Sequence, residues 1–368
     1  MIYQDISCSY KFNQFEWQQV PEDQCLSEFS QQRNLKIGTY NVLFGMPSKI
    51  LNIYSRNKKR FTHIIENIIP ETDPDVLSLM EVTQEFKDML LSNPYIRQNY
   101  YVSHVSKIYQ RRLFEVFVIS KQPFTSIYLV DSKQGRYQFS IFHNQEVWKS
   151  FILISTHLWA GEGDFGSRQK QLSLVNQCIL DRNFLNSRHI NDTIKQIANI
   201  AIQNNNIILQ GDLNLHMRHE DAYIYENGFI DTYREIYPFQ DGYTWDSAQN
   251  NFINSVFIFD DRRMRLDRIL LRKSCNLFQI QDVKILGKEK IGIGLCASDH
   301  YLLLSILKIN ENPQNLIQQY DTSNIVQDQN TGFRTIQTII KIRKVFLFGI
   351  IFSIILLAVG IPLLIIYK

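Results

Sequence analysis

The sequence predicts an α/β or α+β domain over residues 35–310, and three observations support this fold class. Short apolar runs with the length of buried strands recur through the region, and several end in a polar or charged side chain. Amphipathic segments with helical spacing separate some of these runs. A chain of 368 residues with 45% hydrophobic content can also bury one large domain with appendages. We therefore expect strands and helices mixed in one domain, after a polar extension over residues 1–34.

The first two expected strands both carry a polar side chain near their ends. Residues 36–43 predict a strand that contains Asn41, and residues 75–82 predict a second strand that contains Glu81. An unpaired buried amide costs on the order of 1–3 kcal/mol, so Asn41 needs a structural partner or a ligand. Repetition of the pattern favours a shared site at the strand ends.

A helix is expected between these strands, because Phe61, Ile64, Ile65 and Ile68 share one helical face. Pro70 and Pro74 bracket a turn after this helix, and basic residues lie at the start of the helix. A phosphate site is one interpretation of them, but a solvated helix face is the commoner one. The basic residues are Arg56, Lys58, Lys59 and Arg60.

The middle of the chain continues the pattern. Residues 100–148 alternate well enough for several antiparallel strands, and residues 116–119 form the clearest one. Residues 151–158 predict a buried strand that reaches His157, which is either a satisfied structural group or part of a site. We expect two helices in residues 167–206, separated by an Asn-rich interruption near residues 182–191.

Residues 207–216 are the most informative stretch. A short apolar run breaks at Gly211 and leads directly to Asp212 and Asn214, two positions apart. At a strand end, these two side chains can face the same substrate atom. Asp and Asn after Gly also make ordinary turns, so this stretch alone leaves both interpretations open.

The last third adds an acidic residue in a cationic run and an Asp-His pair. Asp267 and Arg268 lie in the β-like run of residues 262–272, and Asp299 and His300 lie at the start of the last expected strand, which begins near residue 297. Oxygen-rich ligands without cysteine suit Mg²⁺ or Mn²⁺. The candidates for one common site are Asn41, Glu81, His157, Asp212, Asn214, Asp267, Asp299 and His300.

Six short motifs in order give this set a family resemblance over roughly residues 35–309. They resemble the endonuclease/exonuclease/phosphatase superfamily of metal-dependent phosphoesterases, which implies a four-layer sandwich of two packed mixed β-sheets flanked by helices. The motifs are Thr39-Tyr40-Asn41, Met80-Glu81-Val82, Thr156-His157-Leu158, Gly211-Asp212-Leu213-Asn214, Leu266-Asp267-Arg268 and Ser298-Asp299-His300.

The resemblance also implies residue roles. Glu81 would hold Mg²⁺, and Asp299 would assist in placing metal or water. Asp212 would orient or deprotonate the attacking water, with Asn214 and Asn41 positioning it and the phosphate. His300, oriented by Asp267, would contact the scissile phosphate, and His157 would stabilise the pentacovalent transition state. In-line attack on phosphorus needs such positioning and charge neutralisation more than covalent chemistry.

Within the superfamily, the last third is most similar to 5′-tyrosyl-DNA phosphodiesterases, which implies a DNA 5′ end with a tyrosyl adduct as partner. Trp245 would then stack on the DNA end, although packing inside the protein is an equally good interpretation. Arg268 would approach the DNA backbone. His216 stands where an Arg would help to hold phosphate.

The composition and the N-terminus predict the compartment and the kind of partner. A net charge of +3 permits a nucleic-acid partner without requiring one. Five scattered cysteines without a Cys-x-x-Cys pair fit free thiols in a reducing compartment. The N-terminus lacks a cationic start followed by an apolar core, so no secretory signal is expected.

A transmembrane tail anchor is expected after a polar linker at residues 311–344. Residues 345–367 contain no charge and would form a helix about 34 Å long, which matches a hydrocarbon core of roughly 30 Å. Lys341, Arg343 and Lys344 precede this segment and only Lys368 follows it. The charge bias predicts a catalytic part that faces cytosol or nucleoplasm, at the endoplasmic reticulum or nuclear envelope.

Three functional hypotheses remain open on the sequence. The first is a Mg²⁺-dependent phosphodiesterase that acts on 5′-tyrosyl DNA. The second keeps the chemistry but takes a membrane phospholipid, as in neutral sphingomyelinases, where a C-terminal anchor is natural. The third is a tail-anchored scaffold without catalysis, which would have no reason to retain Glu81, Asp212 and His300.

Overall fold

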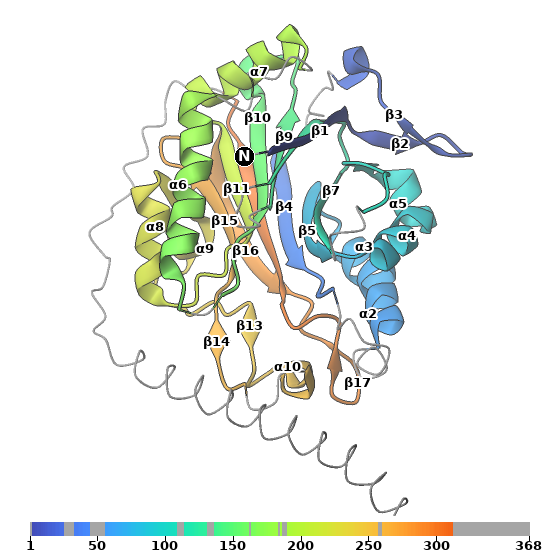
Figure 1. Ribbon diagram of the computed structural model, residues 1–368, viewed down its shortest axis with the longest axis vertical. Coiled ribbons are helices and arrows are strands. Elements are labelled where there is room, and N and C mark those ends of the chain that lie inside the picture. Colours follow the sequence, from blue (N-terminus) through green and yellow to red (C-terminus); the bar gives the residue numbers. More distant parts are fainter. Residues whose placement is uncertain are drawn as a thin grey trace, which may run out of the picture. The chain divides into compact units, whose positions relative to one another are not determined.

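Two large mixed β-sheets pack face to face and carry helices on their outer sides (Figure 1). The computed structural model describes residues 2–25, 33–44, 56–108, 114–130, 136–161, 163–182, 185, 190–256 and 260–311. This architecture confirms the α+β class and the two helix-flanked sheets expected from the resemblance.

The first sheet has seven strands and the second has eight. In spatial order, the first contains β1 (Ile2–Cys8), β8 (Thr125–Val130), β9 (Arg136–Phe142), β10 (Phe151–His157), β11 (Ile207–Asp212), β15 (Asp267–Arg272) and β12 (Phe229–Asp231). The second contains β16 (Phe278–Leu286), β19 (Leu302–Ile309), β4 (Asn34–Asn41), β5 (Val76–Val82), β7 (Glu115–Ser120), β6 (Tyr101–Val102), β2 (Tyr10–Phe12) and β3 (Trp17–Gln19). Two small antiparallel pairs are β13 (Trp245–Asp246) with β14 (Arg263–Met264), and β17 (Lys290–Gly292) with β18 (Leu295–Cys296).

The helices cover the sheets through two separate apolar clusters. One cluster joins the first sheet to α6 (Phe165–Asp181), α7 (Asp192–Gln203) and α8 (Asp221–Glu226). The other joins the second sheet to α2 (Asn57–His63), the π-helical turn η2 (Ile64–Ile68), α3 (Ile69–Thr72), α4 (Gln84–Ser92) and α5 (Pro94–Asn99). The remaining helical elements are η1 (Glu22–Cys25), η3 (Val147–Lys149), η5 (Arg218–Glu220), α9 (Thr232–Ile236) and α10 (Asn251–Val256).

A buried polar contact joins the two sheets at their centres. Ser78 of β5 and Ser155 of β10 share a hydrogen bond of 2.6 Å between their hydroxyls. The Gln210 side-chain amide of β11 donates to the Ser78 hydroxyl and to the Gly38 carbonyl of β4. These four strands form the two parallel pairs, β4 with β5 and β10 with β11. The strands of each pair therefore end at the same edge of their sheet.

The structure corrects three expectations and confirms one. Residues 2–12 are not part of a separate extension, because β1 pairs with β8 and β2 pairs with β6. The helical segment continues through Pro70 to Thr72 after a π-helical turn, where a break was expected. The last strand begins at Leu302, because residues 297–301 form the approach to the sheet. The interruption between α6 and α7 is confirmed.

The membrane prediction concerns a different part of the chain. No helix within the described ranges has both the length and the apolar character needed to cross a bilayer. The expected span, residues 345–367, and the linker from residue 312 lie outside the described residues.

Gly211 is required by the close approach of β10 and β11. Its φ is +142°, and a Cβ there would lie 1.8 Å from the Thr156 carbonyl oxygen. We expect Gly211→Ala to destabilise the fold by roughly 3 kcal/mol or more, through backbone strain and this clash. Gly166→Ala is the control, since nothing lies within 4 Å of a Cβ there. Urea unfolding should separate the two variants, and equal midpoints would contradict this account.

Candidate active site

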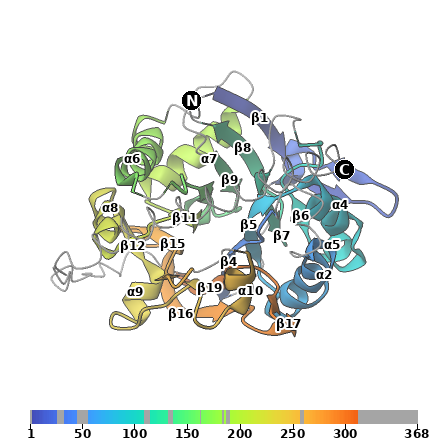
Figure 2. The same ribbon diagram turned by 60° about the horizontal axis from the view of Figure 1, so that its bottom comes forward.

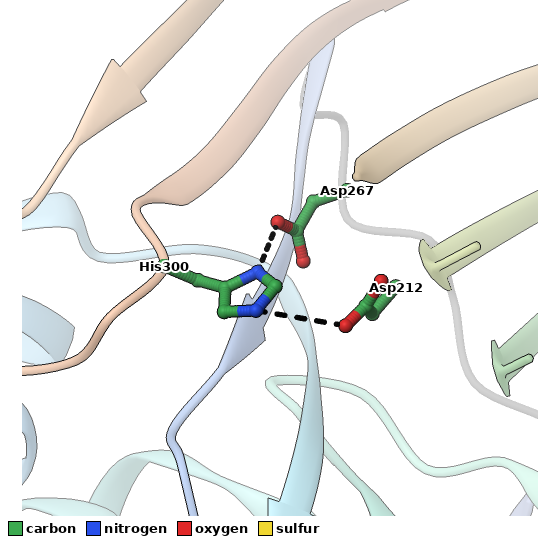
Figure 3. A group of neighbouring side chains, drawn as sticks. All are labelled: Asp212, Asp267 and His300. Atoms are coloured by element: carbon green, nitrogen blue, oxygen red, sulfur yellow. Dashed lines mark hydrogen bonds and ion pairs between the residues drawn. The ribbon is translucent and has the colours of Figure 1, made fainter. Parts of the chain in front are cut away.

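The polar strand ends converge at one edge of the two sheets. Asp212 ends β11 and is in register with His157 of β10 on one side and Asp267 of β15 on the other. His300 comes from the second sheet, two residues before β19. Figure 3 shows the His300 ring between the carboxylates of Asp267 and Asp212. Residues from separate parts of the sequence therefore meet at this edge.

The His300 ring is fixed by two carboxylates. Its Nδ1 lies 2.8 Å from Asp267 Oδ2, and its Nε2 lies 3.7 Å from Asp212 Oδ2. Burial opposes protonation, but the carboxylates of Asp267, Asp212 and Asp299 outweigh it and raise the His300 pKa well above its ordinary value. His300 is thus a buried imidazolium whose Nε2 side faces Asp212.

Asn41 links the two acids that come from different sheets. Its side-chain amide donates to Glu81 Oε1 and to Asp212 Oδ2, at 3.0 Å each. Its side-chain oxygen, Oδ1, accepts a hydrogen bond from the Leu43 backbone N–H at 3.0 Å. Both N–H groups of the Asn41 side chain are therefore used to orient carboxylates.

Two of these residues have left-handed backbones. Glu81 has φ +59° and lies where the pairing of β5 with β7 shifts register, between Leu79 and Val82. Asn214 has φ +50°, and its side-chain amide donates to the Leu158 carbonyl at 3.1 Å. Such conformations cost on the order of 1–3 kcal/mol each and concentrate at functional sites. This register shift in β5 places Glu81 within hydrogen-bond distance of Asn41, at the edge where the other acids lie.

His157 adds a second imidazole to the acids. Its Nε2 lies 3.6 Å from Asp212 Oδ2 and 3.8 Å from Glu81 Oε1. Burial alone would raise the Asp212 pKa, but His300, His157 and the Asn41 hydrogen bond lower it below its ordinary value. Asp212 is therefore ionised at neutral pH although it is buried.

Asp299 is a buried carboxyl whose pKa is raised mainly by its burial. Burial, with the Glu81 carboxylate adding to it, raises its pKa to about 6, against the opposing effects of His300 and Arg60. Its Oδ1 accepts from the Ser298 hydroxyl at 3.1 Å. Burial also raises the pKa of Asp267, which belongs to the same cluster of four acids with Glu81, Asp212 and Asp299.

This donor set fits a divalent cation. Asp212, Asp267 and His300 each offer an atom within 4.8 Å of the others. Since Asp267 and His300 are hydrogen-bonded to each other, Glu81 is the carboxylate better placed to bind a cation. Hard carboxylate oxygens suit Mg²⁺ or Mn²⁺, and a cation there would offset the negative charge of the clustered carboxylates.

The sequence did not indicate the structural role of Arg60. We expected it on a solvated helix face, but its side chain is fully buried. The guanidinium donates to the carbonyls of Val42, Leu43 and Ala297 at 3.0, 3.1 and 2.9 Å. It therefore ties the segment after Asn41 to the segment before Asp299.

The structure changes the roles of the three expected substrate contacts. Arg268 is buried and ion-paired with Asp221 and Asp231, so it does not reach a DNA backbone. Trp245 is also buried, with its ring edge-to-face on His300 at 5.1 Å, and supports that imidazole instead of stacking on DNA. Burial, aided by Arg168 and Arg262, lowers the His216 pKa to about 4, so His216 offers phosphate no charge at neutral pH.

An aromatic wall beside His157 was also missed. Phe44 and Phe114 stack at 5.1 Å, and Phe114 lies 5.6 Å from the His157 ring. The Arg136 guanidinium lies over the Phe114 ring at 4.1 Å. All three wall residues, Phe44, Phe114 and Arg136, are partly exposed. Nothing in their local sequence indicated that they would meet.

The chain resembles known proteins over most of this region. The model of the endonuclease/exonuclease/phosphatase family matches residues 38–300. A search of curated proteins found no match.

Solved structures with the same fold come from animals and a bacterium. TDP2 from D. rerio, complexed with a single-strand DNA product, has 19% identity over 75% of this chain and 100% of its own, with a TM-score of 0.56. Truncated TDP2 from Caenorhabditis elegans has 16% identity over 75% and 97%, with a TM-score of 0.54. An endonuclease/exonuclease/phosphatase family protein from Bacteroides thetaiotaomicron has 13% identity over 75% and 98%, with a TM-score of 0.50. Identities this low show the fold alone.

The contacts of Arg60 predict a large effect of its removal. Arg60→Met leaves three buried carbonyls without this donor, so we expect a loss of roughly 3 kcal/mol or more in unfolding free energy. Lys58→Met, on an exposed position of the same helix, should change it by less than about 0.5 kcal/mol. Urea unfolding checks both variants. A similar small loss in each would show that Arg60 does not hold these segments together.

Proposed function

The chain belongs to the endonuclease/exonuclease/phosphatase family, and from this membership we propose that it is a Mg²⁺-dependent phosphodiesterase that hydrolyses a 5′-phosphotyrosyl bond at a DNA end. The observation that carries the proposal is one continuous set of buried contacts across both sheets. It runs from Asp267 through His300 and Asp212 to Asn41 and Glu81. Both a proton acceptor and a cationic donor are thereby fixed at one place.

Asp212 is the residue that orients the attacking water. Its lowered pKa keeps it ionised, so it accepts a hydrogen bond from water and directs a lone pair toward phosphorus. Its Oδ1 already accepts from the Asn214 backbone N–H at 2.9 Å, and Oδ2 accepts from Asn41. These bonds limit rotation of the carboxylate, which favours one direction of attack.

The two imidazoles stabilise the charge that develops on the phosphoryl oxygens. His300 is held as a cation by Asp267 and Asp212, so a phosphoryl oxygen near its Nε2 would receive a charge-assisted hydrogen bond. His157, on the neighbouring strand β10, offers its Nε2 near Glu81 and Asp212. Asn214 and Asn41 hydrogen-bond to Asp212, the acid that both imidazoles face.

Glu81 would hold the metal, with Asp299 assisting. The bound cation would supply neutralisation of the phosphate charge and of the crowded carboxylates. The protein's contribution is the strained turn that presents Glu81 and the Phe44 backbone N–H that donates to its Oε2 at 3.0 Å.

The aromatic wall supports an aromatic leaving group. Phe44 and Phe114 offer ring faces beside His157, and Arg136 places a cation over one of them. A tyrosyl ring or a terminal base can stack there. Phenol, with a pKa of about 10, is also a far better leaving group than an alkyl alcohol. A similar structure, TDP2 from D. rerio, was solved with a single-strand DNA product.

The test is release of tyrosine from a 5′-phosphotyrosyl oligonucleotide by the full chain, with Mg²⁺ and with chelator. We expect release with metal and none with chelator. Metal-dependent cleavage of sphingomyelin without tyrosine release would contradict the DNA substrate and favour the lipid alternative. Absence of both reactions would favour the non-catalytic scaffold.

Removal of the Asp212 charge should slow the reaction without unfolding the domain. We expect Asp212→Asn to lower kcat by ~10²–10⁴, the usual loss for a group that accepts a proton in the transition state. Asp192→Asn is the control, because the Asp192 side chain is 98% exposed and lies on α7. Steady-state kinetics on the tyrosyl oligonucleotide check both, and an unchanged kcat in Asp212→Asn would exclude this role.

The aromatic wall should affect substrate binding more than turnover. We expect Phe114→Ala to raise KM for the tyrosyl oligonucleotide about tenfold, the loss expected for one stacked ring. Phe239→Ala, at a loop position with 90% exposure, is the matched control. An equal KM in both variants would remove the wall from substrate recognition.

A further inference from the structure

The hairpin of β17 and β18 carries an apolar side chain that the fold does not use. Ile293 lies in its turn and is 98% exposed, more than any other large apolar residue that the structure describes. Gly292 precedes it and Gly294, with φ +62°, follows it. One exposed apolar residue is ordinary on a protein surface, so its surroundings decide what it means.

Cations surround the base of this turn. A Cβ added to Gly292 would lie 3.2 Å from the Lys59 amine and 3.8 Å from Arg56 Nη1, so both groups lie against the hairpin backbone. Lys290 is exposed on the hairpin itself, and Lys58 is exposed beside Lys59.

Ion pairs among the described residues do not include these cations. The nearby acid Glu289 is paired with His63 at 3.1 Å. We call Ile293 with Arg56, Lys58, Lys59 and Lys290 the hairpin patch.

The hairpin patch lies next to the candidate active site. Leu295 and Cys296 of β18 pack with Leu43 and Phe252 in one apolar cluster. Leu43 follows Asn41 by two residues, and Cys296 precedes Asp299 by three. Figure 2 shows β17 beside α2 and α10. A partner bound at the patch would therefore lie close to the substrate.

We propose that the hairpin patch docks on an anionic phospholipid surface, with Ile293 entering the boundary between headgroups and acyl chains. The four cations would then lie at the depth of the lipid phosphates, where basic residues are attracted to anionic membranes. The charge complementarity is local, since the patch is cationic in a chain whose net charge is only +3.

Two further observations favour lipid over nucleic acid. The apolar member of the patch is aliphatic, whereas binding of single-stranded nucleic acid uses aromatic faces for base stacking. The chain outside the described residues also includes the uncharged residues 345–367, joined to the domain by a polar linker. If this segment spans a bilayer as predicted, the linker keeps the domain at a membrane surface. This inference is independent of the substrate at the active site.

The chain provides a matched control for the hairpin patch. Phe15 lies in the turn between β2 and β3 and is 86% exposed, so it is also an apolar side chain at a hairpin tip. Its neighbours Asn13, Gln14 and Glu16 provide no cation. An apolar tip without cations should not respond to anionic lipid.

The experiment attaches an environment-sensitive fluorophore to Ile293→Cys or Phe15→Cys in the full chain, with labelled wild type as background for the native cysteines. Each protein is mixed with vesicles of phosphatidylcholine, or of phosphatidylcholine with phosphatidylserine. We expect a blue shift and a severalfold increase in emission at position 293 only with phosphatidylserine. Position 15 should not change. Reversal of charge in Lys59→Glu with Lys290→Glu should abolish the response at 293.

Two outcomes would overturn the proposal. One is an unchanged emission at position 293 with anionic vesicles. The other is a response to a single-stranded oligonucleotide alone, which would assign the patch to nucleic acid. Limited trypsin cleavage after Lys290 in the unlabelled chain gives a second measurement if the cysteine variants fail to fold. Protection by phosphatidylserine vesicles, and not by phosphatidylcholine, supports docking, and equal cleavage contradicts it.

Discussion

The clustering of four carboxylates at the meeting edge of two sheets, three of them buried and Glu81 partly buried, is the constraint on which the site depends. Removing a charge from water costs several kcal/mol even after relaxation, so each acid needs hydrogen bonds or a countercharge. Asn41 serves Glu81 and Asp212, and His300 serves Asp267. Arg60 is a buried cation that lowers the Asp299 pKa. The remaining negative charge is what a divalent cation would offset.

The fold makes this concentration possible through its two parallel strand pairs. Strands β4 and β5 end at one edge of their sheet, and β10 and β11 do the same in the other. The hydrogen bonds among Ser78, Ser155 and Gln210 fix one sheet on the other at the centre. Side chains just beyond these strands then meet across the interface. Strain at Glu81 and Asn214 completes the alignment, and the packed sheets maintain it.

The sequence was most informative where the chemistry lies at strand ends. An apolar run that breaks into Asp212 and Asn214, or reaches His157, has no packing reason to do so, and the pattern predicted their convergence. The class of fold and the break between α6 and α7 followed from periodicity. Residues 2–12 were misjudged because short edge strands with polar side chains have little apolar pattern, and their pairing with β8 and β6 is a tertiary contact.

Contacts made across the fold could not be predicted from local sequence. Arg60 lies in a basic run that resembles a solvent-exposed helix face, yet it is the buried member, while Lys58 and Lys59 face solvent. Arg268 was expected to approach the DNA backbone, and Trp245 was expected either to stack on DNA or to pack inside the protein. Both side chains are buried: Arg268 is ion-paired with Asp231, and Trp245 packs on His300. The wall of Phe44, Phe114 and Arg136 is assembled from three separate segments.

Metal binding at Glu81 is the central claim, and calorimetric titration of the full chain with Mn²⁺ tests it most directly. The account predicts a saturable binding heat in the wild type that is lost in Glu81→Gln and retained in Asp73→Asn, an acid paired with Lys121 away from the site. Equal heats in Glu81→Gln and the wild type, or no binding by either, would contradict it.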